Sequence, residues 1–215
     1  PVHLYGQSCD MAPIIKLAEK HNLKIIEDNA QAIGCKYKFS NDEIKFTGTI
    51  GHLGTTSFYP SKNLGCYGDG GAIFTNDDEL AYKIKSIRIH GGGKDKYQNE
   101  RVGINGRLDS IQAAVLLEKI EIFNNELKLR NKASEYYTQN INKKCISPHI
   151  PDKYYSSWAQ YSIILPKHIS RNNIIKKLEK NGIPSMVYYK IPVHLQKGYA
   201  QYGYKPGEFV ISENI

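Results

Sequence analysis

The stretch from residue 55 to residue 72 constrains the fold more than any other part of the chain. An apolar and aromatic run leads to Pro60, one lysine follows as Lys62, and four glycines lie within the seven residues from Gly65 to Gly71. Glycine allows positive φ angles and the close approach of a ligand, and burial lowers the pKa of a lysine until its amine is a nucleophile. The pattern predicts a strand that ends near a lysine suited to Schiff-base chemistry. The alternative is a solvated lysine beside an ordinary turn.

The composition is typical of a globular chain without a membrane segment. Hydrophobic residues make up 40% and charged residues 23% of the 215 residues, which suits one large domain, or one domain and part of another. The longest apolar run, Ala113–Leu117, is far shorter than the ~18 residues that span a bilayer. No charged and apolar leader opens the sequence. We therefore expect a cytoplasmic protein without a membrane partner.

Neither the cysteines nor the positive charge indicates a metal site or a nucleic-acid site. The four cysteines have no CxxC spacing and form no cluster with histidine at zinc spacing, so we predict reduced thiols and no bound metal. The net charge of +8 comes from basic residues that are scattered rather than grouped. A nucleic-acid partner is therefore not predicted, and the charge suits the attraction of an anionic substrate instead.

The first residues of the chain are typical of a βαβ unit. We predict a strand over Val2–Tyr5, a helix that begins after Asp10, and a second strand over Leu23–Glu27. The strands of such a unit are parallel, and ligands bind beyond their carboxyl ends. Asp28 and Gln31 would lie at this edge. Asp28 could equally cap a short helix that begins at residue 30.

The rest of the pattern predicts an α/β chain with two domains. The expected elements are an extended or loop connection at 44–54, strands at 55–59 and 71–75, a helix after Asn76, and a long helix from Asp109 or Ser110 to about Tyr137. After a linker with two prolines at 147–151, we expect a strand at 157–165, a helix capped by Ser170 and a strand at 185–189. These elements place residues 1–138 in a large domain and residues 139–215 in part of a smaller one.

Several motifs resemble those of one enzyme family. Ser57–Gly65 with Gly68–Gly71 is similar to the pyridoxal-phosphate lysine segment of the DegT/DnrJ/EryC1/StrS nucleotide-sugar aminotransferases. Glu27–Gly34 is similar to their pyridine-binding motif, and Arg101–Ala114 and Tyr188–Gln196 resemble two further segments. The resemblance implies a fold type I transferase, similar to aspartate aminotransferase, with a mixed sheet in the large domain. It also implies that the chain is a fragment that lacks an N-terminal segment and a C-terminal tail.

The resemblance implies roles for individual residues around pyridoxal 5'-phosphate (PLP). Lys62 would hold the cofactor covalently, and the Asp28 carboxylate would keep the pyridine nitrogen protonated. Gln31 would reach the region of the cofactor's 3-oxygen. Ser57 would bind the phosphate, although it also reads as an ordinary polar residue of an alternating strand. Asn105 would reach the phosphate of the partner subunit's cofactor, which implies a homodimer with shared active sites.

Contacts with the substrate are implied for four further residues, Arg107, Tyr188, Tyr189 and His194. Arg107 suits an acidic group on the substrate, because its guanidinium forms strong paired hydrogen bonds with such groups. Tyr188, Tyr189 and His194 belong to the segment that closes over the sugar in the family. The family often has a histidine where Tyr188 stands, so the sequence departs from the pattern at this contact.

The activity implied by the resemblance is transfer of an amino group from L-glutamate to a nucleotide-linked keto sugar, with ping-pong kinetics. Similarity around Ser61–Gly71 and Lys96–Arg107 favours a UDP-linked 3-keto sugar of a bacterial surface polysaccharide. Two alternatives stay open. One is the sugar dehydratase branch, which has a histidine in place of Lys62 and holds pyridoxamine phosphate without a covalent bond. The other is a PLP-binding regulator or an inactive truncated homologue.

Overall fold

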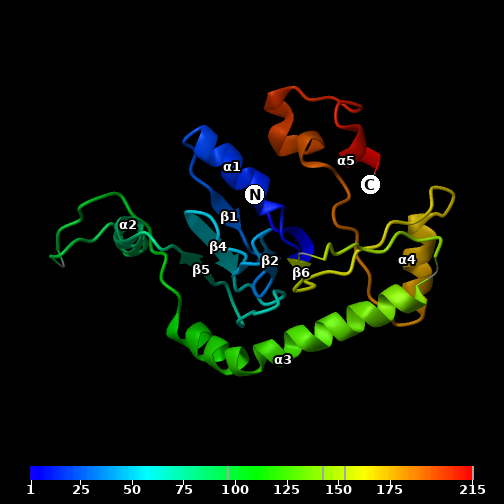
Figure 1. Ribbon diagram of the computed structural model, residues 1–215, viewed down its shortest axis with the longest axis horizontal. Coiled ribbons are helices and arrows are strands. Elements are labelled where there is room, and N and C mark those ends of the chain that lie inside the picture. The colour runs from blue at the N-terminus through cyan, green and yellow to red at the C-terminus, as the bar shows by residue number, and fades with distance from the viewer. Residues whose placement is uncertain (96, 142, 153, 215) are drawn as a thin grey trace. The chain divides into compact units, whose positions relative to one another are not determined.

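The computed structural model describes residues 1–95, 97–141, 143–152 and 154–214. The chain forms two compact units, whose elements can be followed by colour in Figure 1. The first unit contains residues 1–139 and 149–161, and the second contains residues 140–148 and 162–215. Residues 149–161 thus belong to the first unit although they follow the long helix. The assignment of residues 1–138 to a large domain and 139–215 to a small one stays a prediction.

A three-stranded mixed sheet lies at the centre of the first unit. Its strand order is β1 (Ile26–Asp28), β4 (Leu53–Ser57) and β5 (Gly71–Phe74). β1 is parallel to β4, with Asp28 opposite Thr55, and β5 is antiparallel to β4. The carboxyl ends of β1 and β4 therefore meet at the same edge of the sheet, which is the edge that the sequence predicted for the site.

The first residues of the chain pair with this sheet over a shorter stretch than the sequence predicts. Val2 forms a parallel bridge with Asp28, but Leu4–Gly6 is a 3₁₀ turn (η1), so the predicted strand over residues 2–5 is wrong beyond its first residues. The reason is the backbone at Tyr5 and Gly6, whose φ angles of 61° and 93° end the extended conformation.

Helix α1 (Met11–Lys20) begins after Asp10, as predicted. The Asp10 carboxylate does not cap the helix; it accepts a hydrogen bond of 2.6 Å from the Tyr37 hydroxyl. Buried Met11 and Ala18 pack with Ile25 and Tyr37 in the first core cluster, which fills the space between α1 and the strands.

A second sheet in the first unit was not predicted from the sequence. β2 (Lys36–Lys38) lies between β3 (Ile44–Phe46) and β6 (Tyr154–Tyr155), and both pairings are antiparallel. Its strands have two or three residues each, too few for a clear alternation of polar and apolar positions. The Tyr37 ring contacts the Tyr154 ring with centroids 5.2 Å apart, so this sheet closes the first core cluster.

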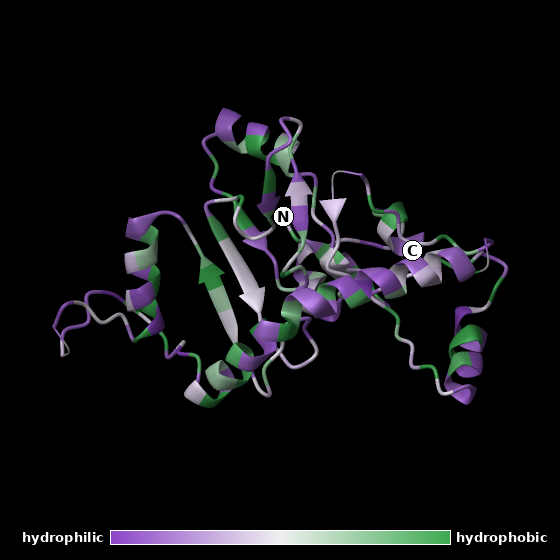
Figure 2. Cartoon of the chain, turned by 60° about the horizontal axis from the view of Figure 1, so that its bottom comes forward, coloured by the Kyte–Doolittle hydropathy of each residue, from purple (hydrophilic) through white to green (hydrophobic). Residues whose placement is uncertain are grey.

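Two helices follow β5. Helix α2 (Asp78–Arg88) is capped by the Asp77 carboxylate, one residue after the expected Asn76. Helix α3 (Ser110–Asn140) begins where the sequence predicted. In Figure 2 hydrophobic and hydrophilic residues alternate along this long helix. Only part of its apolar surface is covered: Leu116 and Leu127 are buried, whereas Ile111 is 74% exposed.

The second unit has helices and turns but fewer strands than predicted. Helix α4 (Arg171–Lys180) is capped by the Ser170 hydroxyl, as expected. The short helices η2 (Val193–Leu195), η3 (Lys197–Tyr202) and α5 (Val210–Asn214) follow. The strand predicted at 157–165, which begins in the first unit, and the strand predicted at 185–189 are wrong. Among the described residues, no strand partner lies beside either segment apart from one bridge, Ile146 with Ile164, and an unpaired strand is not stable.

Candidate functional site

Asp28 and Ser57 lie at the same edge of the central sheet, at the carboxyl ends of β1 and β4. One Asp28 oxygen, Oδ1, accepts the Ala30 N–H at 3.0 Å. The residues after Asp28 form a turn, so the alternative of a short helix capped by Asp28 is wrong. The Oδ2 atom of Asp28 has no hydrogen bond among the residues that the structure describes. One carboxylate oxygen thus fixes the side chain, and the other is available to a ligand.

The segment from Phe58 to Gly70 forms a closed loop at the end of β4. The Phe58 N–H donates to the Gly70 carbonyl at 2.8 Å, and the Phe58 carbonyl accepts the Cys66 N–H, also at 2.8 Å. A Cβ on Gly65 would lie 2.7 Å from each of two carbonyl oxygens across the loop. The glycine is therefore required for the backbone to cross itself this closely.

Lys62 lies in this loop, half-buried. Its backbone N–H donates to the Tyr59 carbonyl at 2.9 Å and closes a turn. Leu64 and Cys66, which follow it, are buried against Leu116 of α3 in the second core cluster. Within the described part of the chain, the Lys62 ammonium makes no hydrogen bond or ion pair. The backbone and the apolar residues hold the loop in place, whereas the Lys62 amine has no partner among the described residues.

A chain of hydrogen bonds joins the Lys62 loop to Gln31. The Asn63 amide donates to the Ser157 carbonyl at 2.7 Å, and the Ser157 N–H donates to the Gly6 carbonyl at 2.8 Å. The next residue back, Tyr5, donates its N–H to Gln31 Oε1 at 2.7 Å. These contacts hold Gln31 and the residue beside Lys62 in one framework.

The segment 156–160 is the part of this framework that the sequence did not reveal, because we read it as the start of a strand. Ser156 and Ser157 are 2% and 0% exposed, and both contact the Gly6 carbonyl. Trp158 has a φ angle of 47°, which ends any extended run. No local pattern in the sequence indicates the close backbone contact that forms here.

Two buried oxygen atoms near this framework have no partner among the described residues, Asn29 Oδ1 and Gln160 Oε1. Asn29 follows Asp28 directly, and the Gln160 N–H reaches the Tyr5 carbonyl at 3.4 Å. Buried acceptors are satisfied in nearly all native proteins. Either atom would be satisfied by a donor group of a bound molecule.

Asn105 and Arg107 lie in the exposed connection between α2 and α3. Arg107 Nε donates to Asn105 Oδ1 at 3.1 Å, and Asn105 pairs with Ile89 in an isolated bridge. Among the described residues, no hydrogen bond joins either side chain to the Lys62 loop. Within one chain, Asn105 and Arg107 therefore contact each other. Their roles at the cofactor and the substrate stay predictions.

Tyr188, Tyr189 and His194 lie in the second unit. The two tyrosine rings contact each other edge to face, with centroids 5.3 Å apart. His194 Nε2 lies 3.0 Å from Glu213 Oε1, and the His194 ring packs against Phe209 with centroids 4.6 Å apart. Their contacts with a substrate stay predictions.

Comparison with known proteins identifies the family. The model of the DegT/DnrJ/EryC1/StrS aminotransferase family matches residues 1–215, the whole chain. The chain belongs to this family. The predicted family and fold class are therefore confirmed. The chain spans a little over half the length of the relatives that it matches, between 51% and 57% of the curated ones.

Two curated relatives and two solved structures are similar to this chain along most of its length. A "Pleiotropic regulatory protein" of Geobacillus stearothermophilus is 44% identical over 99% of this chain and 56% of its own length. The UDP-2-acetamido-2-deoxy-3-oxo-D-glucuronate aminotransferase of Pseudomonas aeruginosa is 43% identical over 93% of this chain and 54% of its own. A family aminotransferase from Brucella abortus superposes with a TM-score of 0.90 at 46% identity, over 99% of this chain and 55% of that one. The sugar aminotransferase Spr1654 of Streptococcus pneumoniae, solved in a PLP form, superposes with a TM-score of 0.83 at 25% identity, over 95% and 57%.

A buried hydrogen bond between His3 and Glu27 lies next to Asp28 in the sequence, and the sequence did not predict it. His3 Nε2 and Glu27 Oε2 are 2.8 Å apart, and both side chains are fully buried. Glu27 also accepts N–H groups from Gly48 at 2.9 Å, Ile50 at 2.7 Å and Gly51 at 2.6 Å. Burial raises the pKa of the Glu27 carboxyl, but these hydrogen bonds outweigh burial and hold the pKa below 4.5. Glu27 is thus an anion that ties the strand of Asp28 to the chain start and to the 48–51 turn.

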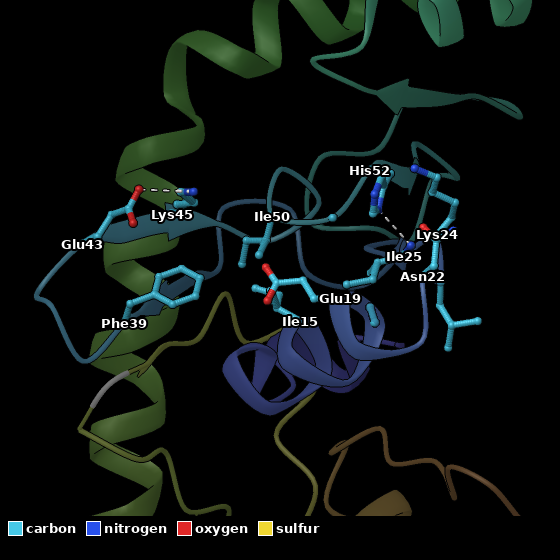
Figure 3. A pocket seen from close by; sticks show the side chains of 13 residues that line it. Ile15, Glu19, Asn22, Lys24, Ile25, Phe39, Glu43, Lys45, Ile50 and His52 are labelled. Carbon is cyan, nitrogen blue, oxygen red and sulfur yellow. Dashed lines mark hydrogen bonds and ion pairs between the residues drawn. The ribbon is translucent and has the colours of Figure 1, made fainter.

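A cavity of about 480 Å³ lies elsewhere in the first unit, between α1, β3 and the residues around Ile25 (Figure 3). None of the predicted site residues lines it. Its polar groups serve the fold: Lys45 pairs with Glu43 at 3.2 Å, and His52 Nδ1 accepts the Ile25 N–H at 3.0 Å. We therefore place the candidate active site at the sheet edge with Lys62.

Two negative findings refer to the described residues alone. None of their helices combines the length and the hydrophobicity that a membrane crossing requires. Nor does any group of three or more His, Cys, Asp or Glu side chains among them suit a metal ion.

Proposed function

We propose that the full-length protein transfers an amino group from L-glutamate to a nucleotide-linked keto sugar, with PLP bound at the sheet edge. The observation that carries the proposal is the position of Lys62. Lys62 lies in the loop that follows β4, and its amine has no hydrogen bond or ion pair among the described residues. Asp28 ends the adjacent parallel strand. Membership of an aminotransferase family supports the same activity.

The residues present fit this cofactor. PLP carries an aldehyde, a pyridine nitrogen and a phosphate, and the sheet edge offers a lysine amine, a carboxylate and a hydroxyl. The Ser57 oxygen accepts the Tyr59 N–H at 3.2 Å. Among the described residues the Ser57 O–H has no acceptor, so it would donate to a phosphate oxygen.

Each residue then has a defined task. When bound, the cofactor supplies an electron sink for the charge that develops at Cα of the amino acid. Asp28 Oδ2 would hold the proton on the pyridine nitrogen, and the Tyr5 N–H keeps Gln31 Oε1 in place at 2.7 Å. Lys62 binds the cofactor through Nζ and, once released, moves the proton from Cα of the amino acid.

We propose a UDP-linked 3-keto sugar of a bacterial surface polysaccharide as the amino acceptor. The support is the 43% identity to the Pseudomonas aeruginosa enzyme, whose name specifies a UDP-linked 3-oxo sugar acid. Arg107 suits the acidic group of such a sugar.

A regulatory role is the second candidate, because the Geobacillus stearothermophilus relative is named a pleiotropic regulatory protein. The sugar dehydratases that resemble this family have a histidine in place of the lysine. Lys62 therefore argues against a dehydratase.

The function is tested with the full-length protein, L-glutamate and a UDP-linked 3-keto sugar. We expect stoichiometric 2-oxoglutarate and amino sugar, and borohydride should fix the cofactor to Lys62, as seen by peptide mapping. A dTDP-linked 4-keto sugar serves as the competing acceptor. Cofactor binding without amino transfer to either sugar would favour the regulatory role, and a label on another lysine would contradict the site.

Asp28→Asn is expected to fold but to lose at least about 10²–10³-fold in kcat, since one preorganised electrostatic contact contributes roughly 3–4 kcal/mol. The amide keeps the shape and the Ala30 contact but loses the charge that holds the pyridine proton. Asp42→Asn is the control, because Asp42 forms only an exposed pair with Lys38. Turnover of Asp28→Asn close to that of Asp42→Asn would return Asp28 to a purely structural role.

The proposed homodimer with shared sites predicts complementation between two defective proteins. Lys62→Ala and Asn105→Ala homodimers are mixed and allowed to exchange subunits. If Asn105 serves the partner's site, one site of each mixed dimer carries both changes and the other carries neither, so activity rises above that of both parents. Exchange is verified with two affinity tags. Confirmed exchange without a rise would show that Asn105 acts in its own chain or not at all.

A further inference from the structure

The side chain of Asn131, on helix α3, makes three hydrogen bonds that the proposed function does not use. Its amide nitrogen Nδ2 donates to the Leu127 carbonyl at 2.8 Å and to the Ser156 carbonyl at 3.2 Å. Its oxygen Oδ1 accepts the indole N–H of Trp158 at 3.1 Å. An indole N–H only donates and a carbonyl only accepts, so the three contacts fix the orientation of the amide. Asn131 thus ties the segment 156–158 to the helix.

These hydrogen bonds lie on both sides of Ser157. Asn131 holds the carbonyl of the residue before it and the indole of the residue after it. The neighbouring Arg130 donates from Nη1 to the Trp158 carbonyl at 3.2 Å. Ser157 itself is fully buried, and its N–H donates to the Gly6 carbonyl at 2.8 Å. Contacts with α3 and with Gly6 therefore determine where the Ser157 carbonyl lies.

The Ser157 carbonyl is the acceptor that holds the residue after the lysine. It accepts the Asn63 amide at 2.7 Å, and Asn63 follows Lys62 directly. Asn63 is 8% exposed, so little water competes for this hydrogen bond. The hydrogen bonds that join α3 to the Lys62 loop directly lie further along the loop, at Gly65 and Tyr67. Among the described residues, Asn63 is thus the residue nearest to Lys62 that a hydrogen bond joins to a segment outside the loop.

We propose that Asn131 is a positioning residue for Lys62, which acts through Ser157 and Asn63. By fixing the Ser157 carbonyl, it fixes the acceptor that holds the backbone beside the lysine. Without the Asn131 amide, Arg130 alone of these two residues still binds the segment 156–158. The inference rests on the proposed function only for the task of the lysine, because the hydrogen bonds from Asn131 to the loop involve no ligand.

Hydrogen–deuterium exchange of the cofactor-free full-length protein tests whether Asn131 holds the loop. Asn131→Leu keeps the approximate size of the side chain and removes all three hydrogen bonds. We expect the amides of residues 58–70 to exchange roughly tenfold faster, the effect of one typical hydrogen bond, and those of β1 and β4 to keep their rates. Asn124→Leu, about two turns earlier on α3, is the control. Asn124 is exposed, and its side chain has no hydrogen bond among the described residues.

Unchanged exchange in residues 58–70 would overturn the proposal. An equal increase in β1 and β4 would also overturn it, because Asn131 would then stabilise the fold as a whole rather than position the loop. If Asn131→Leu does not fold, Asn131→Asp decides by the same criteria. The aspartate keeps an acceptor for the indole N–H and loses the donor to the Ser156 carbonyl.

Amino transfer tests whether the held loop matters to the lysine. A misplaced amine slows the chemical step more than it weakens binding of the amino acid, so Asn131→Leu should lower kcat roughly tenfold and change KM for L-glutamate less than about twofold. Asn63→Ala removes the link to Ser157, so in that background Asn131→Leu should cause no further loss of kcat. Losses that add in the double variant would overturn the route through Asn63. A protein without amino transfer would contradict the proposed function, and the exchange rates would then decide on Asn131.

Discussion

Replacing Lys62 by alanine in the full-length protein is expected to abolish amino transfer and to leave the cofactor without a covalent bond. One amine performs both tasks, so nucleophile and proton carrier are lost together. General acid–base catalysis alone contributes about 10²–10⁴-fold, and loss of the nucleophile adds to it, so we expect kcat to fall at least 10⁴-fold on that estimate. The measurement is 2-oxoglutarate formation under saturating glutamate.

Lys119 offers a matched control in the same part of the fold. Its Nζ donates to the Gly65 carbonyl at 2.6 Å and lies 5.4 Å from the centre of the Tyr67 ring, so it supports the Lys62 loop from α3. Lys119→Met should weaken this support and keep the covalent bond to the cofactor. If Lys62→Ala retained the covalent bond, or Lys119→Met lost it, the assignment of the lysine would be wrong.

Glu27→Ala is expected to cost at least about 3 kcal/mol in the free energy of unfolding, because each buried donor left without its acceptor costs about 1–3 kcal/mol. Here three backbone N–H groups lose their acceptor as well as His3. Urea denaturation of the full-length protein measures the loss. Glu43→Ala is the control: its pair with Lys45 is exposed, and the expected change is below about 0.5 kcal/mol.

The free energy of unfolding should also depend on pH through Glu27. The pKa of Glu27 is lower in the folded state than its ordinary value of 4.5. A carboxyl of this kind binds fewer protons when folded, so its contribution is fully present above about pH 4.5 and disappears as the pH falls through the folded-state pKa. Glu27→Gln should lose this acid-dependent part of the unfolding free energy. If Glu27→Gln kept the pH profile of the unaltered protein, Glu27 would not be the source of the acid-dependent loss of stability.

The sequence predicted the positions of Asp28 and Lys62 after strands of the central sheet, but it did not predict the second sheet. Asp28 and Lys62 follow strands, and the meeting of parallel strand ends at one edge is a general property of α/β sheets, so their neighbourhood could be inferred. The short strands β2, β3 and β6 could not, because their pairing depends on contacts between distant segments rather than on local alternation.

The burial of Glu27 and of Ser157 is likewise invisible to local patterns. Both are polar residues whose partners, the 48–51 turn and Gly6, lie far away in the sequence. The strand predicted at 157–165 was wrong for the same reason: its apolar alternation is present, but the Trp158 backbone and the contacts with Gly6 impose a different course.

The hydrogen bonds of residues 156–160 with Tyr5, Gly6 and Asn63 determine when the Lys62 loop can become ordered during synthesis. Ser156 Oγ binds the Gly6 carbonyl across 150 positions, and Asn63 binds Ser157 across 94. Closing such long loops costs entropy before the contacts repay it, and such folds form slowly. A ribosome that has translated the lysine has therefore not yet produced the segment that holds its loop in place. The nascent chain acquires a rigid cofactor site only after about a hundred more residues have emerged, since domains fold as whole units.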